Sequence, residues 1–309
     1  MHDAKTVHLL GYATGLAGAD PRSSEGPKVL QQSPYFQALS TEIDLIWDGM
    51  IESPSDKNIS KLELITTCVQ KLANKTYDYT KAKKFFTVLG GDHSSAIGTW
   101  SGVSNALSGP LGLIWIDAHM DSHTPHTSLT GNIHGMPLAC LLGYGTSSLT
   151  TIMNNRPKVK PENICLIGVR SFERGEAALL KELNVKIFFM EEIRQRGLQA
   201  VMQDALKIVK KDTAGYGISL DIDGIDPSEA PGTGSPVPNG LNANDLCQAL
   251  HQIENDPQFL GMEIVEFDPS KDKDHKTEKL IPELFASMIL AKKKANTAKH
   301  CLHLDPVSV

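Results

Sequence analysis

The chain has 309 residues, enough for one large α/β domain or for two domains of average size. A hydrophobic fraction of 40%, a charged fraction of 21% and a formal net charge of −6 are typical of a globular protein and leave no basic surface for nucleic acid. No run approaches the ~20 apolar residues of a membrane span, and the first apolar stretch is too short for a signal peptide. We therefore expect a cytoplasmic protein with neither nucleic acid nor membrane as a partner.

Eight short apolar segments rich in β-branched residues predict eight strands. Nearly all are continuously apolar rather than alternating, which is typical of strands covered on both faces of a parallel sheet. In chain order they are Val7–Leu10, Leu45–Trp47, Phe85–Leu89, Leu113–Ile116, Ile164–Ile167, Val185–Phe189, Ile218–Leu220 and Leu260–Val265. The sequence therefore predicts a mainly parallel eight-stranded sheet.

Helical periodicity appears between these strands. Ser60 and Glu63 form a capping box ahead of the first helix. The apolar stripes are Leu62, Ile65, Val69 and Leu72; then Leu198, Val201, Ala205 and Ile208; then Leu246, Leu250 and Ile253. Alternating strands and helices predict one three-layer α/β/α domain over residues 1–309.

Three polar segments are expected at the surface. Ser53–Ile59 and Ser270–Thr277 are predicted to be exposed loops, and the basic Lys292–Lys299 the solvated face of a final helix. The five cysteines are spread along the chain without a CxxC pair, so we expect reduced thiols rather than disulfides or a zinc knuckle.

Acidic residues and histidines gather directly after three of the predicted strands. The segments are Gly90-Gly91-Asp92-His93, Asp117-Ala118-His119-Met120-Asp121 and Asp221-Ile222-Asp223-Gly224-Ile225-Asp226-Pro227. Ligands of open α/β sheets bind beyond the carboxyl ends of the strands, so these segments can converge. One cluster alone could be a helix cap or a structural histidine, but D-x-H-x-D and D-x-D spacing directs alternate residues to one side. Several carboxylates this close together would repel one another unless cations neutralised them. The pattern therefore predicts a metal site.

The donor set indicates which metal binds. Two imidazoles and four carboxylates without a thiolate favour Mn²⁺ ahead of Fe²⁺, Co²⁺ or Zn²⁺. Six ligands are too many for one catalytic ion. Two ions ~3.5–4 Å apart, sharing bridging carboxylates, would use all six and could hold a bridging hydroxide as the nucleophile.

The same segments resemble the signature motifs of the ureohydrolase superfamily, and most closely those of arginases. They are G-G-D-H-S at 90–94, D-A-H-x-D at 117–121 and S-L-D-I-D-G-I-D-P at 219–227. T-G-N-I-H-G at 130–135 is similar to the S-G-N-x-H-G of arginases, and E-G-P at 25–27 and V-E-F-D-P at 265–269 match in kind and order. The resemblance spans roughly residues 7–290.

This resemblance implies two Mn²⁺ ions held by two histidines and four aspartates. One ion would be bound by His93 and Asp121, the other by His119 and Asp223, and both by the bridging Asp117 and Asp221. The resemblance also implies that Glu266 anchors the substrate guanidinium and that His134 transfers protons. Asp92 is expected to support the loop that carries His93, and Asp226 to cap a turn before Pro227.

The chain departs from arginases around the predicted substrate pocket. His123 replaces the usual Asn and Thr130 the usual Ser, both among the groups that bind the α-carboxylate of the amino acid. The family's D-x-D after I-G-x-R becomes Ser171-Phe172-Glu173, so the acid expected near the α-amino group is one methylene longer. Asn132 is retained. We expect His123, Thr130, Asn132 and Glu173 to bind the substrate.

These features predict hydrolysis of L-arginine to L-ornithine and urea. Other enzyme substrates are agmatine, guanidinobutyrate or other guanidino acids, and formiminoglutamate. A non-catalytic metal-binding paralogue would be expected to lose a ligand, the proton-transfer histidine or the guanidinium anchor, and candidates for all three are present. The resemblance further implies a homo-oligomer, a trimer or a hexamer, that acts on a small guanidino compound.

Overall fold

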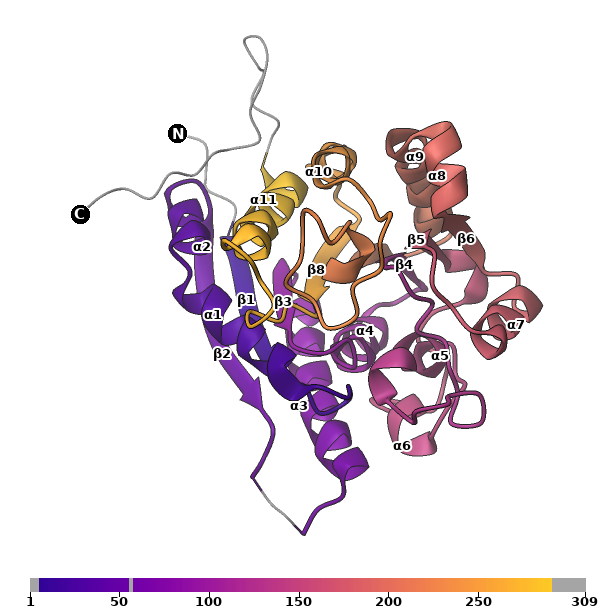
Figure 1. The fold of residues 1–309 in the computed structure, drawn as a ribbon. Coiled ribbons are helices and arrows are strands. Elements are labelled where there is room, and N and C mark those ends of the chain that lie inside the picture. Colours follow the sequence, from indigo (N-terminus) through magenta and orange to yellow (C-terminus); the bar gives the residue numbers. More distant parts are fainter. Residues whose placement is uncertain (1–5, 56–57, 291–309) are drawn as a thin grey trace.

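The computed structural model describes residues 6–55 and 58–290, which form one sheet of eight parallel strands (Figure 1). Its order is β2-β1-β3-β8-β7-β4-β5-β6, and every neighbouring pair is parallel. The strands are β1 (Thr6–Ala13), β2 (Asp44–Glu52), β3 (Phe86–Gly90), β4 (Leu111–Ile116), β5 (Ile164–Val169), β6 (Lys186–Phe189), β7 (Gly215–Asp221) and β8 (Phe259–Val265). The predicted eight-stranded parallel sheet is confirmed.

Helices cover both faces of this sheet, so the three-layer α/β/α arrangement is also confirmed (Figure 1). One apolar core joins the sheet to α1 (Gly26–Gln32), α2 (Pro34–Ala38), α8 (Met190–Arg196), α9 (Leu198–Lys210), α10 (Ala243–Leu250) and α11 (Lys276–Ile289). The other joins it to α3 (Lys61–Lys81), α4 (Ser95–Ala106), α5 (Pro137–Leu141), α6 (Ser147–Thr150) and α7 (Arg174–Glu182). Among the described residues no helix is long and apolar enough to cross a bilayer.

The interior strands differ from the edge strands in burial. Every residue of β3, β4, β5 and β7 is buried, as their continuous apolar sequences predict. In contrast, β2 lies at an edge and exposes much of its length. It runs over Asp44–Glu52, whereas the apolar pattern predicted only Leu45–Trp47, because polar side chains are tolerated where one side of a strand is solvated.

The predicted helical stripes lie in α3, α9 and α10, and the Ser60/Glu63 capping box is present. The third stripe differs in one detail, because α10 ends at Leu250 and Ile253 lies in a following 3₁₀ turn. Helix α4, with the sequence SAIGTWSGVSNA, was not predicted. A Cβ at its Gly102 would lie 2.1 Å from the carbonyl oxygen of Ala73, so the small residues permit close packing on α3 rather than forming a loop.

The surface predictions were met in part. Ser53–Ile59 contains no helix or strand among its described residues. The prediction of an exposed loop over Ser270–Thr277 is wrong at the end of that range, because α11 begins at Lys276 and Thr277 is fully buried. The cysteines Cys68, Cys140, Cys165 and Cys247 are buried, and none of them forms a disulfide within the described part of the chain. Lys292–Lys299 and Cys301 lie outside the described residues.

Candidate active site

Four neighbouring strands at the centre of the sheet, β3, β8, β7 and β4, carry the predicted site residues at or beyond their carboxyl ends. His93 follows β3, the segment Asp117–Asp121 follows β4, Asp221 ends β7, and Glu266 directly follows β8. Segments distant in sequence therefore converge at one edge of the sheet, as the topology of open α/β sheets requires.

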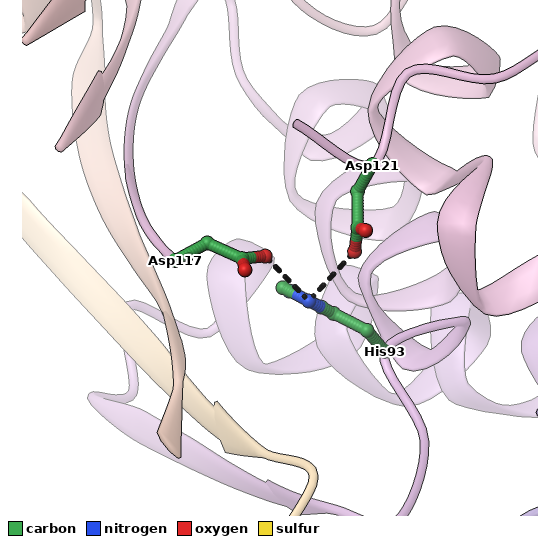
Figure 2. A group of neighbouring side chains, drawn as sticks. All are labelled: His93, Asp117 and Asp121. Atoms are coloured by element: carbon green, nitrogen blue, oxygen red, sulfur yellow. Dashed lines mark ion pairs between the residues drawn. The ribbon is translucent and has the colours of Figure 1, made fainter. Parts of the chain in front are cut away.

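His93 lies at the centre of the first group of ligand atoms. Its Nδ1 atom lies 3.3 Å from Asp117 Oδ2, 3.0 Å from Asp121 Oδ2 and 3.2 Å from Asp221 Oδ2. Figure 2 shows the imidazole between Asp117 and Asp121. This buried nitrogen has no hydrogen-bond partner among the described residues. Buried polar atoms are nearly always satisfied, so an unpaired nitrogen facing three carboxylates fits a metal ligand.

His119 lies at the centre of a second group. Its Nδ1 atom lies 3.1 Å from Asp223 Oδ2 and 3.5 Å from Asp117 Oδ1. Potential ligand atoms of His119, Asp117 and Asp223 lie within 4.8 Å of one another, as do those of His93, Asp117 and Asp121. Asp117 thus belongs to both groups and could bridge two cations.

Backbone amides orient the carboxylates. The N–H of His119 donates to Asp117 Oδ1 at 2.7 Å, and the N–H of Asp223 donates to Asp221 Oδ1 at 2.8 Å. Asp117 and Asp221 each direct their Oδ2 atom toward His93. Asp121 has φ 47°, in the left-handed region that a non-glycine residue seldom adopts. Such strain is concentrated at functional sites, where the surrounding fold maintains it.

The electrostatics of these groups favour a bound cation. Burial raises the pKa of Asp221 well above its usual value, and neighbouring Asp223 and Asp117 raise it further. Burial likewise raises the pKa of Asp223, to about 6. Burial opposes a charge on His93, yet the adjacent carboxylates raise its pKa well above the usual value. The cluster therefore accumulates negative charge that protons or metal ions must neutralise.

A buried polar network that the sequence did not reveal determines the tautomer of His93. Its Nε2 atom lies 2.9 Å from Ser219 Oγ, which donates to Glu263 Oε1 at 2.6 Å. Trp100 Nε1 and Thr99 Oγ1 also donate to Glu263, at 2.7 and 2.8 Å. Because the Ser219 hydroxyl donates to Glu263, its oxygen accepts from Nε2–H, and a neutral His93 directs the Nδ1 lone pair at the carboxylates. The single acid within the apolar β8 was the available sequence signal.

Replacing Ser219 by Ala is expected to weaken metal binding ~10–100-fold, because partners that orient a metal ligand typically contribute that much to affinity. Metal affinity would be measured by competition with a chromophoric chelator. Ser101→Ala is the matched control, since Ser101 is a buried serine whose hydroxyl has no hydrogen-bond partner in the described parts of the chain. Equal affinities for the two variants would contradict this role of Ser219.

Arg170 holds the loop that follows β7 and was also missed by the sequence analysis. Its guanidinium donates to the carbonyl oxygens of Asp223 at 2.7 Å, Gly224 at 3.1 Å and Val237 at 2.7 Å. It therefore fixes the backbone of a predicted metal ligand. Asp92 accepts the N–H of Ser94 at 3.0 Å in the loop that carries His93, and Asp226 accepts the N–H of Ser228 at 3.0 Å across the turn at Pro227, as predicted.

His134 and Glu266 form a pair beside these groups. Glu266 Oε1 accepts the N–H of His93 at 2.9 Å and lies 3.1 Å from His134 Nδ1. Burial opposes protonation of His134, but Glu266 outweighs it and raises the pKa of His134 to about 9. Although burial acts in the opposite direction, contact with His134 leaves the pKa of Glu266 below its usual value. Glu266 has φ 65°, so both a predicted metal ligand and the predicted anchor adopt strained backbone.

One polar pocket joins the predicted substrate residues to the His/Asp groups. Its lining comprises His119, Asp121, His123, Ser128, Leu129, Thr130, Asn132, His134, Gly135, Glu173, Glu176, Asp221, Asp223, Ser235 and Glu266. Thr130 and Asn132 are adjacent on the wall, where the Asn132 N–H donates to Thr130 Oγ1 at 3.2 Å. His123 and Glu173 are in contact at 2.9 Å, with the buried Glu176 beside them. Glu176 was not predicted, and neither were Ser128 and Ser235.

Adjacent groups of ligands that share a carboxylate are the arrangement with which two-metal hydrolases bind their ions. The fold and this site thus define the protein as a metal-dependent hydrolase.

The Arginase family model matches residues 5–291. Arginases from Bacillus caldovelox and Brevibacillus brevis are 40% and 41% identical, covering 92% of this chain and 98% and 97% of theirs. The crystal structure of Bacillus subtilis arginase superposes with TM-score 0.87 at 37% identity, covering 94% of this chain and 100% of that one. The chain therefore belongs to the arginase family and is a ureohydrolase, an enzyme that acts on guanidino substrates.

Proposed function

We propose that the protein hydrolyses L-arginine to L-ornithine and urea and requires two Mn²⁺ ions. The main support is that two groups of potential ligands sharing Asp117 open into one pocket with the His134–Glu266 pair. By resemblance to the family, we also propose that the enzyme is cytoplasmic and forms a trimer or a hexamer.

The donor set fits the proposed ions. His93 and Asp121 would hold one, His119 and Asp223 the other, and Asp117 and Asp221 both. Imidazole and carboxylate donors without thiolate favour Mn²⁺, and four carboxylates offset the formal charge of two such ions. When bound, the ions would lower the pKa of a water molecule, so that it becomes a nucleophile at neutral pH, and stabilise the charge that develops on the substrate.

Glu266 is placed to orient the substrate guanidinium. It lines the pocket, its side chain is only 10% exposed, and its lowered pKa keeps it ionised. A carboxylate in a largely desolvated position binds a guanidinium more strongly than one in bulk water. The guanidino carbon would thus be held close to the His/Asp groups.

His134 would deliver the proton that the leaving amine requires. Its side chain is 28% exposed and lines the pocket, so it can exchange protons with substrate and solvent. With a pKa of about 9 it carries a proton at neutral pH. A positioned imidazole of this kind can protonate the departing amine and later accept a proton from the replacement water.

Two residues of the pocket lining suit a carboxylate. The Thr130 hydroxyl and the Asn132 side-chain amide can both donate hydrogen bonds, and both residues line the pocket. Glu173, together with His123, presents an acidic surface suited to an amine. An α-amino acid with a terminal guanidino group matches both features.

We therefore expect kcat/KM for arginine and for guanidinobutyrate to exceed that for agmatine at least tenfold on the Mn²⁺-loaded protein. Agmatine lacks a carboxylate, and each hydrogen bond to such a charged group contributes about 1.5–3 kcal/mol. Thr130→Val and Asn132→Ala should each reduce this preference. Agmatine equalling or exceeding both acids would overturn the carboxylate assignment, and guanidinobutyrate exceeding arginine would make the protein a guanidino-acid hydrolase.

A further inference from the structure

His123 was expected to bind the substrate carboxylate, but its contacts indicate a different role. We propose that His123 is a positioning residue: it holds the carboxylate of Glu173 at the pocket wall, where Glu173 receives the α-ammonium group of the substrate. This inference rests on the proposed function, because it assigns a specificity role within the same pocket.

Both ring nitrogens of His123 already have protein partners. Nε2 lies 2.9 Å from Glu173 Oε2 and 3.4 Å from Glu176 Oε2, and Nδ1 lies 3.2 Å from Thr127 Oγ1. The Thr124 N–H donates to the same Thr127 hydroxyl at 2.9 Å. The imidazole is therefore fixed on both sides, and its side chain is only 12% exposed. A substrate carboxylate could bind His123 only by displacing one of these partners.

The contact with His123 restrains the exposed side chain of Glu173. Its side chain is 59% exposed, so without a partner it would sample several rotamers. It stands at the N-cap of α7 in a capping box: its backbone N–H donates to Glu176 Oε2 at 3.0 Å, and its own carboxylate accepts the backbone N–H of Glu176. The contact with His123 Nε2 at 2.9 Å adds a second restraint, from outside the helix, that sets the direction of the carboxylate at the pocket wall. The pKa of Glu173 is lowered by its contacts with Glu176 and His123, so its carboxylate is the charged form that binds an ammonium.

Two of the departures from the arginase pattern, His123 and Glu173, are thus in contact. His123 belongs to the segment after β4 and Glu173 to the start of α7, 50 residues later, yet their side chains meet. A longer acid has one more rotatable bond to restrain than a shorter acid, and the imidazole contributes to that restraint beside the capping box. The pocket then recognises an amino acid through two separate groups, Glu173 for the amine and Thr130 with Asn132 for the carboxylate.

Three small ligands separate the two assignments of His123. L-Ornithine has both an α-amino group and a carboxylate, putrescine lacks the carboxylate, and 5-aminopentanoate lacks the α-amino group. Isothermal titration calorimetry on the Mn²⁺-loaded enzyme would give the Kd of each. His123→Asn should weaken ornithine and putrescine about tenfold and leave 5-aminopentanoate within about twofold, since loss of a hydrogen bond to a charged group has about this effect. For arginine turnover, KM should rise while kcat remains within about twofold.

A second variant tests whether His123 acts through Glu173. Glu173→Gln should give the same pattern, and the double variant should bind ornithine no more weakly than Glu173→Gln alone, because a positioning residue has no effect once its partner is lost. His126→Asn, an exposed histidine on the same segment, is the matched control. Metal content equal to that of the wild type would confirm that each variant is folded.

Two results would overturn the inference while leaving the proposed function intact. One is a His123→Asn variant that weakens 5-aminopentanoate but not putrescine, which would show direct carboxylate binding. The other is additive loss in the double variant. Wild-type enzyme that binds none of the three ligands would overturn both this inference and the choice of arginine as substrate.

Discussion

Removing bound metal should abolish hydrolysis of guanidino substrates, and full activity should return at two Mn²⁺ ions per chain. The six proposed ligands include four buried carboxylates, and burial together with repulsion from neighbouring carboxylates raises the pKa of Asp221 and Asp223. One divalent ion would neutralise only half of the formal negative charge of these four carboxylates. The measurement is activity against bound metal during titration of chelator-treated protein.

Two variants sharpen this test. Asp221→Asn should lose metal and activity together, whereas Asp245→Asn, an exposed acid in the first turn of α10, should retain both. Full turnover by metal-free protein, or by protein that never binds more than one ion, would exclude the two-ion mechanism.

His134→Asn should lower kcat by ~10²–10⁴-fold, the usual contribution of a positioned acid–base group. Asparagine can preserve a hydrogen bond to Glu266, but it has no proton to transfer at neutral pH, so metal content should not change. The measurements are kcat for arginine, metal content, and recovery of activity on addition of free imidazole, which we expect to restore part of the rate.

Two other outcomes would assign His134 differently. An unchanged kcat would remove it from proton transfer. Loss of metal would make it a ligand or a structural residue, and added imidazole would then give no recovery.

The clustering of the proposed metal ligands could be predicted from sequence because their spacing is local. Asp117, His119 and Asp121 alternate directly after β4, and Asp221 and Asp223 alternate at the end of β7. Each run shows its ligand pattern within a few residues of an apolar strand. Sheet topology then requires those strand ends to meet, so the site follows once the strands are recognised.

The supporting contacts could not be predicted in the same way. His134 and Glu266 are 132 residues apart and His123 and Glu173 are 50 apart, so each pairing depends on how loops from different strands are placed. Arg170 binds backbone carbonyl oxygens, which every residue has, so the side chains of the loop do not indicate this contact. Strand β2 was predicted too short for a related reason. Its polar residues fit a strand because β2 lies at the edge of the sheet, and its place in the strand order depends on the tertiary fold.

The most direct measurement is product analysis with isotopically labelled reactants. Mn²⁺-loaded protein would be supplied with L-arginine carrying ¹³C at the guanidino carbon, in water enriched in ¹⁸O. We predict equimolar urea and L-ornithine, with all of the ¹³C and one solvent oxygen in urea and no solvent oxygen in ornithine. Release of ammonia with citrulline, or no product from protein that holds two ions per chain, would contradict hydrolysis of arginine at this site.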